Sequence, residues 1–384
     1  MQSFTFHNPT RILFGRGQIA KISREIPAAA RVMLTFGGGS IRQNGVYDQI
    51  QAALKDREVV EFGGIEPNPT FETLMKAVDK ARQERVDFLL AAGGGSVVDG
   101  TKFIAAAVPF DGDPWDLCLR HTPPASALPL GAVLTLPATG SESNGYAVIT
   151  RKSTLEKLSF GHPSLFPCFA VLDPEATFSL PPRQVANGVV DAFVHVMEQY
   201  LTYPADAPLQ DRLAESILQT LVEVGPRTLA EPQDYEARAS LMWCANLALN
   251  GLIGAGVPQD WSTHALGHEL TALHSIDHGR TLAILLPNLL WVQREGKRAK
   301  LLQFAERVWG LREGSEGVRV EGGIVRTREF FESLGVSTHL EDYNPDRDRA
   351  EEIVARLERR GVLPLGERKD LDAAKVREIL LLCR

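Results

Sequence analysis

Histidines gather in one short segment of this 384-residue chain. Four of its nine histidines lie between Asp260 and His278, at His264, His268, His274 and His278 itself. Their spacings of 4, 6 and 4 residues fall near helical repeats, with leucines between them, so we expect the imidazoles to face the protein interior. Clustering of this kind is typical of a metal or catalytic site rather than of ordinary core packing.

A carboxylate and a further imidazole precede this segment. Asp191 and His195 are four residues apart in a stretch with helical periodicity, which puts them on one face with Cβ atoms about 6 Å apart. That spacing suits two ligands of one metal ion, although such a pair also forms simple hydrogen bonds. Nitrogen and oxygen ligands without a thiolate suit Zn²⁺, Fe²⁺, Ni²⁺ or Mn²⁺. Four further histidines exceed what one metal needs, and spacing alone does not say which of them bind.

Two glycine-rich turns, at residues 37–40 and 93–96, indicate a nucleotide site. Each has the sequence Gly-Gly-Gly-Ser, follows an apolar run typical of a strand and precedes a helical segment. Such a turn points backbone N–H groups and the helix dipole at a phosphate, with glycine allowing close approach. One loop alone could be a tight connection, but two favour binding. Neither matches G-x-G-x-x-G, so we expect a different doubly wound nucleotide domain.

Polar residues follow the second loop by one helical turn. Asp99 can accept from a ribose or amide donor and Lys102 can meet phosphate, although both also suit a solvated helix face.

The first loop bears on the choice of cofactor. NAD sites usually hold an acid for the ribose 2′-hydroxyl, and none lies near this loop in the sequence. Gly38, Gly39 and Ser40 leave room and donors for a 2′-phosphate, which favours NADPH over NADH. Arg42 is either a further source of positive charge or simply exposed.

The elements around these motifs predict two domains. Strands at 31–36, 59–62 and 86–92 alternate with helices near 47–54, 72–85 and 96–107, a pattern typical of a parallel sheet. From about residue 187 the chain shows long amphipathic stretches, such as 205–224 and 234–252, with few strand signals. Because Pro181 and Pro182 resist both helix and central strand, we expect an α/β dinucleotide-binding domain at 1–180 and an all-helical metal-binding domain at 181–384.

Charge and composition narrow the partners. The chain has 41 Lys and Arg against 48 Asp and Glu, a net charge of -7 without a basic cluster, which argues against nucleic acid. The sequence begins without a basic and apolar leader and contains no run of about 18 apolar residues, so we expect a cytoplasmic protein without a membrane segment. Its four cysteines are far apart, which indicates neither a zinc ribbon nor a disulfide framework.

Several motifs in order resemble the iron-containing, or group III, alcohol dehydrogenases, especially their NADPH-dependent aldehyde reductase and butanol dehydrogenase branch. The resemblance spans nearly the whole chain and rests on residues 8–15, 64–69, 93–99, 135–142, 187–195 and the histidine segment. It implies a dehydroquinate synthase-like fold with a cleft between the two domains, and a homodimer.

The resemblance also assigns the site residues. It implies that His268 lies close to the nicotinamide and that Gly38, Gly39 and Ser40 receive the 2′-phosphate. His274 matches no role in the family, and we interpret it as an ordinary residue at a helix end. The implied metal ligands are Asp191, His195, His264 and His278. The residues implied to line the cofactor cleft are Gly94, Gly95, Ser96, Asp99, Thr135, Thr139, Asn144 and Lys157.

The expected reaction is reversible reduction of a small aldehyde to a primary alcohol. One divalent metal ion, Zn²⁺ or Fe²⁺, polarises the carbonyl oxygen, NADPH donates hydride, and His268 or a water donates the proton. A lyase resembling dehydroquinate synthase is one alternative, and it would show no net NADPH consumption. A metal- and nucleotide-binding sensor without catalysis is the other.

Overall fold

The structure, a computed structural model, describes residues 1–345 and 349–384. The chain forms two compact units. The sheet unit comprises His7–Pro181 and Glu231–Asn250, and the helical unit comprises Met1–Phe6, Pro182–Ala230 and Gly251–Arg384. These limits differ from the domains predicted at 1–180 and 181–384, because residues 231–250 pack with the sheet and residues 1–6 with the helices.

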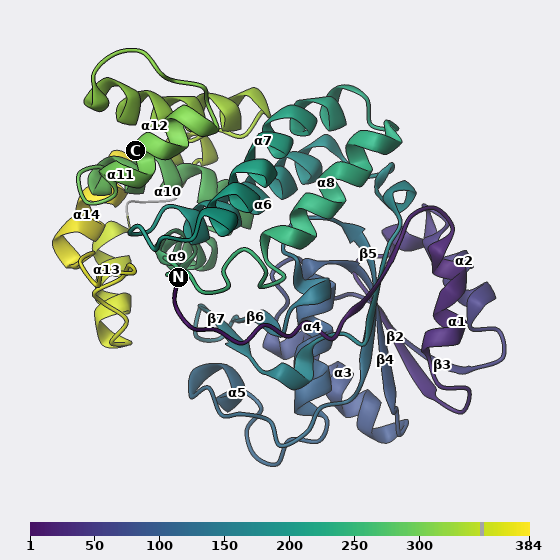
Figure 1. Ribbon diagram of the computed structural model, residues 1–384. Helices are drawn as coiled ribbons and strands as arrows, with labels where there is room; N and C mark the ends of the chain where they lie inside the picture. The colour runs from purple at the N-terminus through teal and green to yellow at the C-terminus, as the bar shows by residue number, and fades with distance from the viewer. Residues whose placement is uncertain (346–348) are drawn as a thin grey trace. The chain divides into compact units, whose positions relative to one another are not determined.

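The sheet unit is built on a six-stranded sheet in the order β1-β8-β5-β4-β2-β3, with every neighbouring pair parallel. Helices α1 and α2 lie on one side of it and α3 and α4 on the other (Figure 1). The strands are β1 (Arg11–Phe14), β2 (Arg31–Phe36), β3 (Glu58–Phe62), β4 (Phe88–Gly94), β5 (Leu130–Leu136) and β8 (Phe169–Leu172). The helices of this unit are η1 (Gln18–Lys21), α1 (Ile22–Glu25), η2 (Ser40–Arg42), α2 (Val46–Ala53), α3 (Phe71–Gln83), α4 (Gly95–Ala107), α5 (Asp116–Leu119), η3 (Ser141–Ser143), η4 (Pro163–Leu165), η5 (Pro174–Thr177) and α8 (Tyr235–Ala248).

Both faces of the sheet are buried along its central strands, which explains why these strands are mostly apolar. In β2, Val32 and Leu34 belong to the core under α1 and α2, while Met33 between them belongs to the core under α3 and α4. Parallel strands covered on both faces need apolar side chains at every position. The strand predicted at 31–36 is confirmed, because β2 has the same bounds.

The two glycine-rich loops follow the carboxyl ends of two neighbouring strands of the sheet. Phe36 at the end of β2 is in register with Ala92 of β4, so the loops that follow these strands leave the sheet side by side. Chain order runs outward from β2 to β3 and then returns to the other side of β2 at β4. Such a reversal opens a crevice at the carboxyl ends of the strands, where doubly wound proteins bind ligands.

Two elements of the sheet unit lie outside the parallel sheet. Strands β6 (Tyr146–Arg151) and β7 (Glu156–Gly161) form an antiparallel hairpin. Helix α8 packs beside η3, where the Asn246 side-chain amide donates to Glu142 Oε1 at 2.7 Å and to Ser143 Oγ at 2.8 Å. Because Glu142 is buried, its carboxylate needs such a donor, and this interaction holds α8 in the sheet unit.

The helical unit holds the remaining elements. Helix α6 begins at Pro182, in the first position that proline tolerates well. The helices are α6 (Pro182–Tyr200), α7 (Pro208–Ala230), α9 (Ser262–His274), α10 (His278–Gln293), α11 (Arg298–Arg307), α12 (Glu316–Ser333), η6 (Leu340–Tyr343), α13 (Ala350–Arg359) and α14 (Ala373–Leu382). The predicted fold class, a parallel α/β part and a helical part, is confirmed. In the described ranges no helix has the length and apolar character needed to cross a membrane.

Candidate functional site

Helix α6 contributes a carboxylate and an imidazole to the interior of the helical unit. Every residue from Val185 to Tyr200 is buried, so the helix is surrounded by protein on all sides. The side chains of Asp191 and His195 are each 5% exposed, and Asp191 Oδ1 lies 3.6 Å from His195 Nε2. The helical spacing predicted from sequence therefore brings these two groups together.

Two further imidazoles reach the same carboxylate from two different helices. His264 Nε2, from α9, lies 3.7 Å from Asp191 Oδ1, and His278 Nε2 lies 3.8 Å from it. Helix α9 ends at His274, and Ser275 adopts a left-handed conformation with φ of 57°. His278 is consequently the first residue of α10, whereas the sequence spacing suggested continuous helical repeats.

The geometry of this cluster fits one divalent cation. The three distances exceed the range of a hydrogen bond, while two ligands about 2.1 Å from a tetrahedral metal are about 3.4 Å apart. Single donor atoms of Asp191, His195 and His264 all lie within 4.8 Å of one another. His278 belongs to the same cluster because its Nε2 atom lies 3.8 Å from Asp191 Oδ1. Imidazole nitrogens with one carboxylate oxygen form a donor set suited to Zn²⁺ or Fe²⁺.

Close packing of α6 against the start of α10 places His278. A Cβ atom at Gly279 would lie 2.5 Å from the backbone oxygen of Asn187, so only glycine allows this approach. The Asn187 side chain donates to Asp277 Oδ2 at 2.9 Å, and Arg183 Nε donates to the same oxygen at 2.8 Å. These contacts fix the first residues of α10 one helical turn from Asp191.

His268 adjoins the cluster but is not one of the three residues, Asp191, His195 and His264, whose donor atoms lie within 4.8 Å of one another. Its half-buried ring lies 5.3 Å from the ring of His278 and 6.3 Å from that of His264, measured between centroids. His274 is in the last turn of α9, where it lines a different pocket with Leu270.

A buried carboxylate, Glu198, lies behind the candidate metal ligands, and sequence reasoning did not find it. Glu198 of α6 is hydrogen-bonded to Nδ1 of His264. Burial by itself lowers the pKa of His264, but the carboxylates of Glu198 and Asp191 outweigh it and raise the pKa to about 9. The signal was present in the sequence, since Asp191, His195 and Glu198 follow a helical i, i+4, i+7 spacing.

In the sheet unit, helix α4 presents an open N-terminus. It begins at Gly95 directly after β4, and no side chain caps its first turn. A Cβ atom at Gly95 would lie 2.3 Å from Thr139 Oγ1, so only glycine fits there. The backbone N–H groups of this turn can therefore receive an anion such as a pyrophosphate. Thr135 lies near the end of β5, beside β4 in the sheet.

Asn68 links two of the predicted cofactor residues. Its backbone N–H donates to Ser96 Oγ at 3.3 Å, and its side-chain oxygen accepts from Lys157 Nζ at 2.8 Å. Asn68 has a left-handed conformation with φ of 56°, which turns the chain at this point. The structure thus brings Lys157 of the hairpin to the second glycine loop, and it adds Asn68 to the residues that shape this site.

Lys102 and Asn144, which were predicted to contact the cofactor, are hydrogen-bonded to other protein groups in this structure. Lys102 Nζ donates to Ser141 Oγ at 2.9 Å, to Asn144 Oδ1 at 3.0 Å and to the backbone oxygen of Tyr146 at 2.6 Å. An ammonium has three donors, so this lysine has none left for a phosphate. The Asn144 amide donates to the backbone oxygens of Gly140 and Leu249. Both residues are buried because they hold the segment at 140–146.

Asp99 belongs to the same network. Its carboxylate accepts from Ser141 Oγ at 2.5 Å and from the Val148 backbone N–H at 2.9 Å. Burial lowers the pKa of Lys102 to about 8, against the opposing effect of the Asp99 and Glu142 carboxylates. The sequence left open that Asp99 and Lys102 lie on a solvated helix face. In the structure they form an internal cluster of charged groups instead, with Lys102 buried and Asp99 half-buried.

The first glycine loop is open. Cβ atoms at Gly38 and Gly39 would meet nothing within 4 Å, and Gly39 has φ of 98° before the short helix η2. The structure brings an acid, Glu61 of β3, to Arg42, with a contact of 2.6 Å. The other Glu61 oxygen accepts from Tyr47 Oη at 2.5 Å and from the Gln51 amide at 3.2 Å. Both Glu61 oxygens are thus engaged, and Arg42 is paired.

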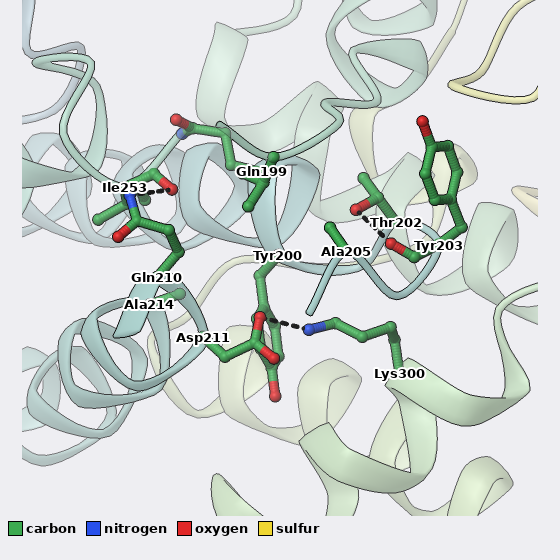
Figure 2. Close-up of a pocket in the computed structure, with 11 residues that line it drawn as sticks. Gln199, Tyr200, Thr202, Tyr203, Ala205, Gln210, Asp211, Ala214, Ile253 and Lys300 are labelled. Atoms are coloured by element: carbon green, nitrogen blue, oxygen red, sulfur yellow. Dashed lines mark hydrogen bonds and ion pairs between the residues drawn. The ribbon is translucent and has the colours of Figure 1, made fainter. Parts of the chain in front are cut away.

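A separate cavity in the helical unit is too small for a substrate. Figure 2 shows it beside Tyr200, with Lys300 donating to Asp211 at 2.6 Å. Its volume is about 10 Å³, enough for one water molecule. Lys300 Nζ also lies 4.1 Å from the centre of the Tyr200 ring. We therefore interpret this region as a polar packing contact between α6, α7 and α11.

The chain belongs to the iron-containing alcohol dehydrogenase family. Residues 9–174 match the family model "iron-containing alcohol dehydrogenase", and residues 185–380 match the C-terminal model of the same family. The chain is 58% identical to the NADPH-dependent aldehyde reductase YqhD of Escherichia coli K12, over 97% of each chain. It is 39% identical to the NADH-dependent butanol dehydrogenase A of Clostridium acetobutylicum, over 99% of each.

Solved structures agree with this assignment. The crystal structure of E. coli YqhD superimposes with a TM-score of 0.98 at 56% identity, covering 100% of this chain and 99% of that one. The NADH-dependent butanol dehydrogenase A of Thermotoga maritima gives a TM-score of 0.95 at 37% identity, with the same coverage. The resemblance to this family noted from the sequence motifs is confirmed.

The network around Lys102 predicts that Lys102→Met destabilises the protein even without nucleotide. The substitution removes three hydrogen bonds and the cation that faces the half-buried Asp99 and the buried Glu142 carboxylates, so we expect a loss of about 3–5 kcal/mol in unfolding free energy. Denaturant unfolding of the apo protein measures it, with the exposed Lys76→Met as a control expected to change stability by less than about 0.5 kcal/mol. Unchanged apo stability combined with weaker NADPH binding would instead assign Lys102 to the phosphate.

Proposed function

We propose that this protein is an NADPH-dependent aldehyde reductase that uses one divalent metal ion. It reduces small aldehydes to primary alcohols and can run the reaction in reverse. The observation that carries the proposal is the convergence of three imidazole nitrogens on the buried Asp191 carboxylate, at 3.6 to 3.8 Å. The 58% identity to a relative named as an NADPH-dependent aldehyde reductase supports the substrate class and the cofactor.

In this proposal Asp191, His195, His264 and His278 hold the metal. A metal ion bound there supplies Lewis acidity toward a carbonyl oxygen, and NADPH supplies the hydride. Asp191 contributes the negative charge of the ligand set, and the three imidazoles bind as neutral donors. In this proposal His268, whose ring lies beside that of His278, would give a proton to the alkoxide and so complete the alcohol, because imidazole titrates closest to neutral pH.

The glycine loops and their surroundings hold NADPH in this proposal. The open first turn of α4, at Gly95 and Ser96, receives the pyrophosphate through backbone N–H groups. Gly38, Gly39 and Ser40 take the 2′-phosphate, for which the open space at the two glycines leaves room. The remaining contacts that we propose are Gly94, Asp99, Thr135, Thr139 and Lys157. The family resemblance supports a homodimer, and we propose that the protein acts in the cytoplasm, where NADPH is available.

The proposal is tested by following NADPH absorbance with butanal as the substrate. Apo protein is reconstituted separately with Zn²⁺ and with Fe²⁺, and a chelator and NADH serve as controls. We expect metal-dependent NADPH oxidation that a chelator abolishes, faster with NADPH than with NADH. NADPH binding without net oxidation of the nucleotide, with any aldehyde, would favour a lyase or a sensor over a reductase.

The cofactor preference predicts the effect of Gly38→Asp. The new carboxylate meets open space, so the fold should tolerate it, but it repels a 2′-phosphate and can accept from a 2′-hydroxyl. A repulsion of about 2 kcal/mol would weaken NADPH binding about 30-fold while NADH binding stays level or improves. Dissociation constants for both nucleotides measure this, with Gly38→Ala as the uncharged control. Equal weakening of both nucleotides would contradict the assignment of this loop.

The division of labour among the histidines predicts two different outcomes. His264→Ala removes a ligand and should lose bound metal together with activity. His268→Ala should lower turnover by about 10²- to 10⁴-fold, the usual contribution of a proton donor, while metal content stays near that of the wild type. Elemental analysis and turnover measured on the same samples decide between them. Equal metal loss in both variants would contradict a separate role for His268.

A further inference from the structure

Glu198 satisfies two different parts of the α9 segment with one carboxylate. It is buried, at 4% exposure, and projects from α6 one turn beyond His195. Its Oε1 atom accepts the backbone N–H of Thr263 at 2.6 Å and that of His264 at 3.2 Å. Its Oε2 atom is hydrogen-bonded to Nδ1 of the His264 ring. The first N–H groups of a helix have no partner within the helix, so Glu198 caps α9 from another helix while holding its metal ligand.

The chemistry of this contact determines which ring nitrogen is available to a metal. An ionised carboxylate only accepts hydrogen bonds, so Nδ1 of His264 carries a proton when it is bonded to Glu198. The neutral ring then has its lone pair on Nε2, the atom that lies 3.7 Å from Asp191 Oδ1. A carboxylate behind a histidine ligand of this kind fixes both the tautomer and the ring orientation.

We propose that Glu198 is a positioning residue that presents Nε2 of His264 to the metal. This inference rests on the metal site of the proposed function, and it assigns a role to a residue that does not itself touch the metal. Because the same carboxylate holds the backbone and the ring of His264, a shift of α9 and a rotation of the imidazole are both opposed. The ring of His195 stacks on that of His264, with centroids 4.6 Å apart, which restricts the ring further.

The surroundings of Glu198 hold it in place. Its backbone oxygen accepts the N–H of Asp260 at 2.8 Å, and Asp260 Oδ1 accepts the N–H and the hydroxyl of Ser262 at 2.9 and 2.5 Å. Lys297 Nζ lies 3.0 Å from Asp260 Oδ2 and 2.9 Å from Glu367 Oε2, and all three side chains are at most 4% exposed. The start of α9 is thus anchored by two acids, and a buried lysine offsets the charge of one of them.

Glu198→Gln tests the inference with little change in shape. A glutamine that donates its amide N–H to His264 Nδ1 forces the ring proton onto Nε2, which blocks metal binding. A glutamine turned the other way points its NH₂ group at the backbone N–H groups of α9. We therefore expect the dissociation constant for Zn²⁺, measured by competition with a chromophoric chelator, to rise about 10- to 100-fold.

Glu215→Gln is the matched control. Glu215 is a buried carboxylate of the same unit and accepts from Tyr200 Oη at 2.8 Å and from Gln303 at 2.7 Å, so its loss also removes buried hydrogen bonds. We expect this variant to unfold at a lower temperature but to bind Zn²⁺ within about twofold of the wild type. Glu198→Gln binding Zn²⁺ as tightly as the wild type, or no more weakly than Glu215→Gln, would overturn the inference while leaving the metal site intact.

Two further outcomes are distinguishable. A wild-type protein that does not bind Zn²⁺ or Fe²⁺ would overturn the proposed metal site itself, and the role of Glu198 with it. If Glu198→Gln does not fold, ¹⁵N-histidine NMR of the metal-loaded wild type decides, with His264 assigned by its absence in His264→Asn. A protonated Nδ1 and a ligated Nε2 on His264 support the inference, and ligation through Nδ1 overturns it.

Discussion

A carboxylate buried in the middle of a helix is the constraint around which the helical unit is organised. Asp191 lies in a helix that is buried on all sides, and a charge in such a place is costly unless an opposite charge or several donors compensate it. Three imidazoles from α6, α9 and α10 converge on it. The glycine at 279 and the capping of α9 by Glu198 serve this convergence, because each brings a helix end within reach of Asp191. The packing of three helices is therefore inseparable from the donor set that they present.

In the sheet unit, main-chain groups take the part that charged side chains take in the helical unit. The ligand site that we propose there uses backbone N–H groups at the open start of α4, while the buried cation Lys102 is directed away to hold the segment at 140–146. Glycine is required at 95 because Thr139 occupies the space of a side chain. The anion recognition that we propose there uses the main chain, and the hydrogen bonds of Asp99 and Lys102 hold the neighbouring segments in place.

Sequence patterns predicted those parts of the fold that depend on local periodicity. The strand at 31–36 and the end of α4 at 107 were predicted at the bounds that the structure has, because a buried strand leaves a clear apolar pattern and Pro109 follows the end of the helix. The placement of α8 with the sheet could not be predicted, since it depends on a hydrogen bond between Asn246 and the distant Glu142. The break at Ser275 was hidden as well, because 4, 6 and 4 spacings resemble helical repeats even though His278 opens a new helix.

The same distinction between local and long-range information applies to the cofactor. Relatives of this chain are named for NADPH and for NADH, so membership of the family does not decide between them. The acid absent from the first loop in the sequence is present in space as Glu61, but Arg42, Tyr47 and Gln51 occupy both of its oxygens. Because Arg42 is paired in turn, neither a free acid nor a free cation of this pair acts on the loop. A preference for NADPH would then rest on open space and on neutral donors such as Ser40. Neutral hydrogen bonds are roughly half as strong as charge-assisted ones, so the discrimination they provide should be moderate.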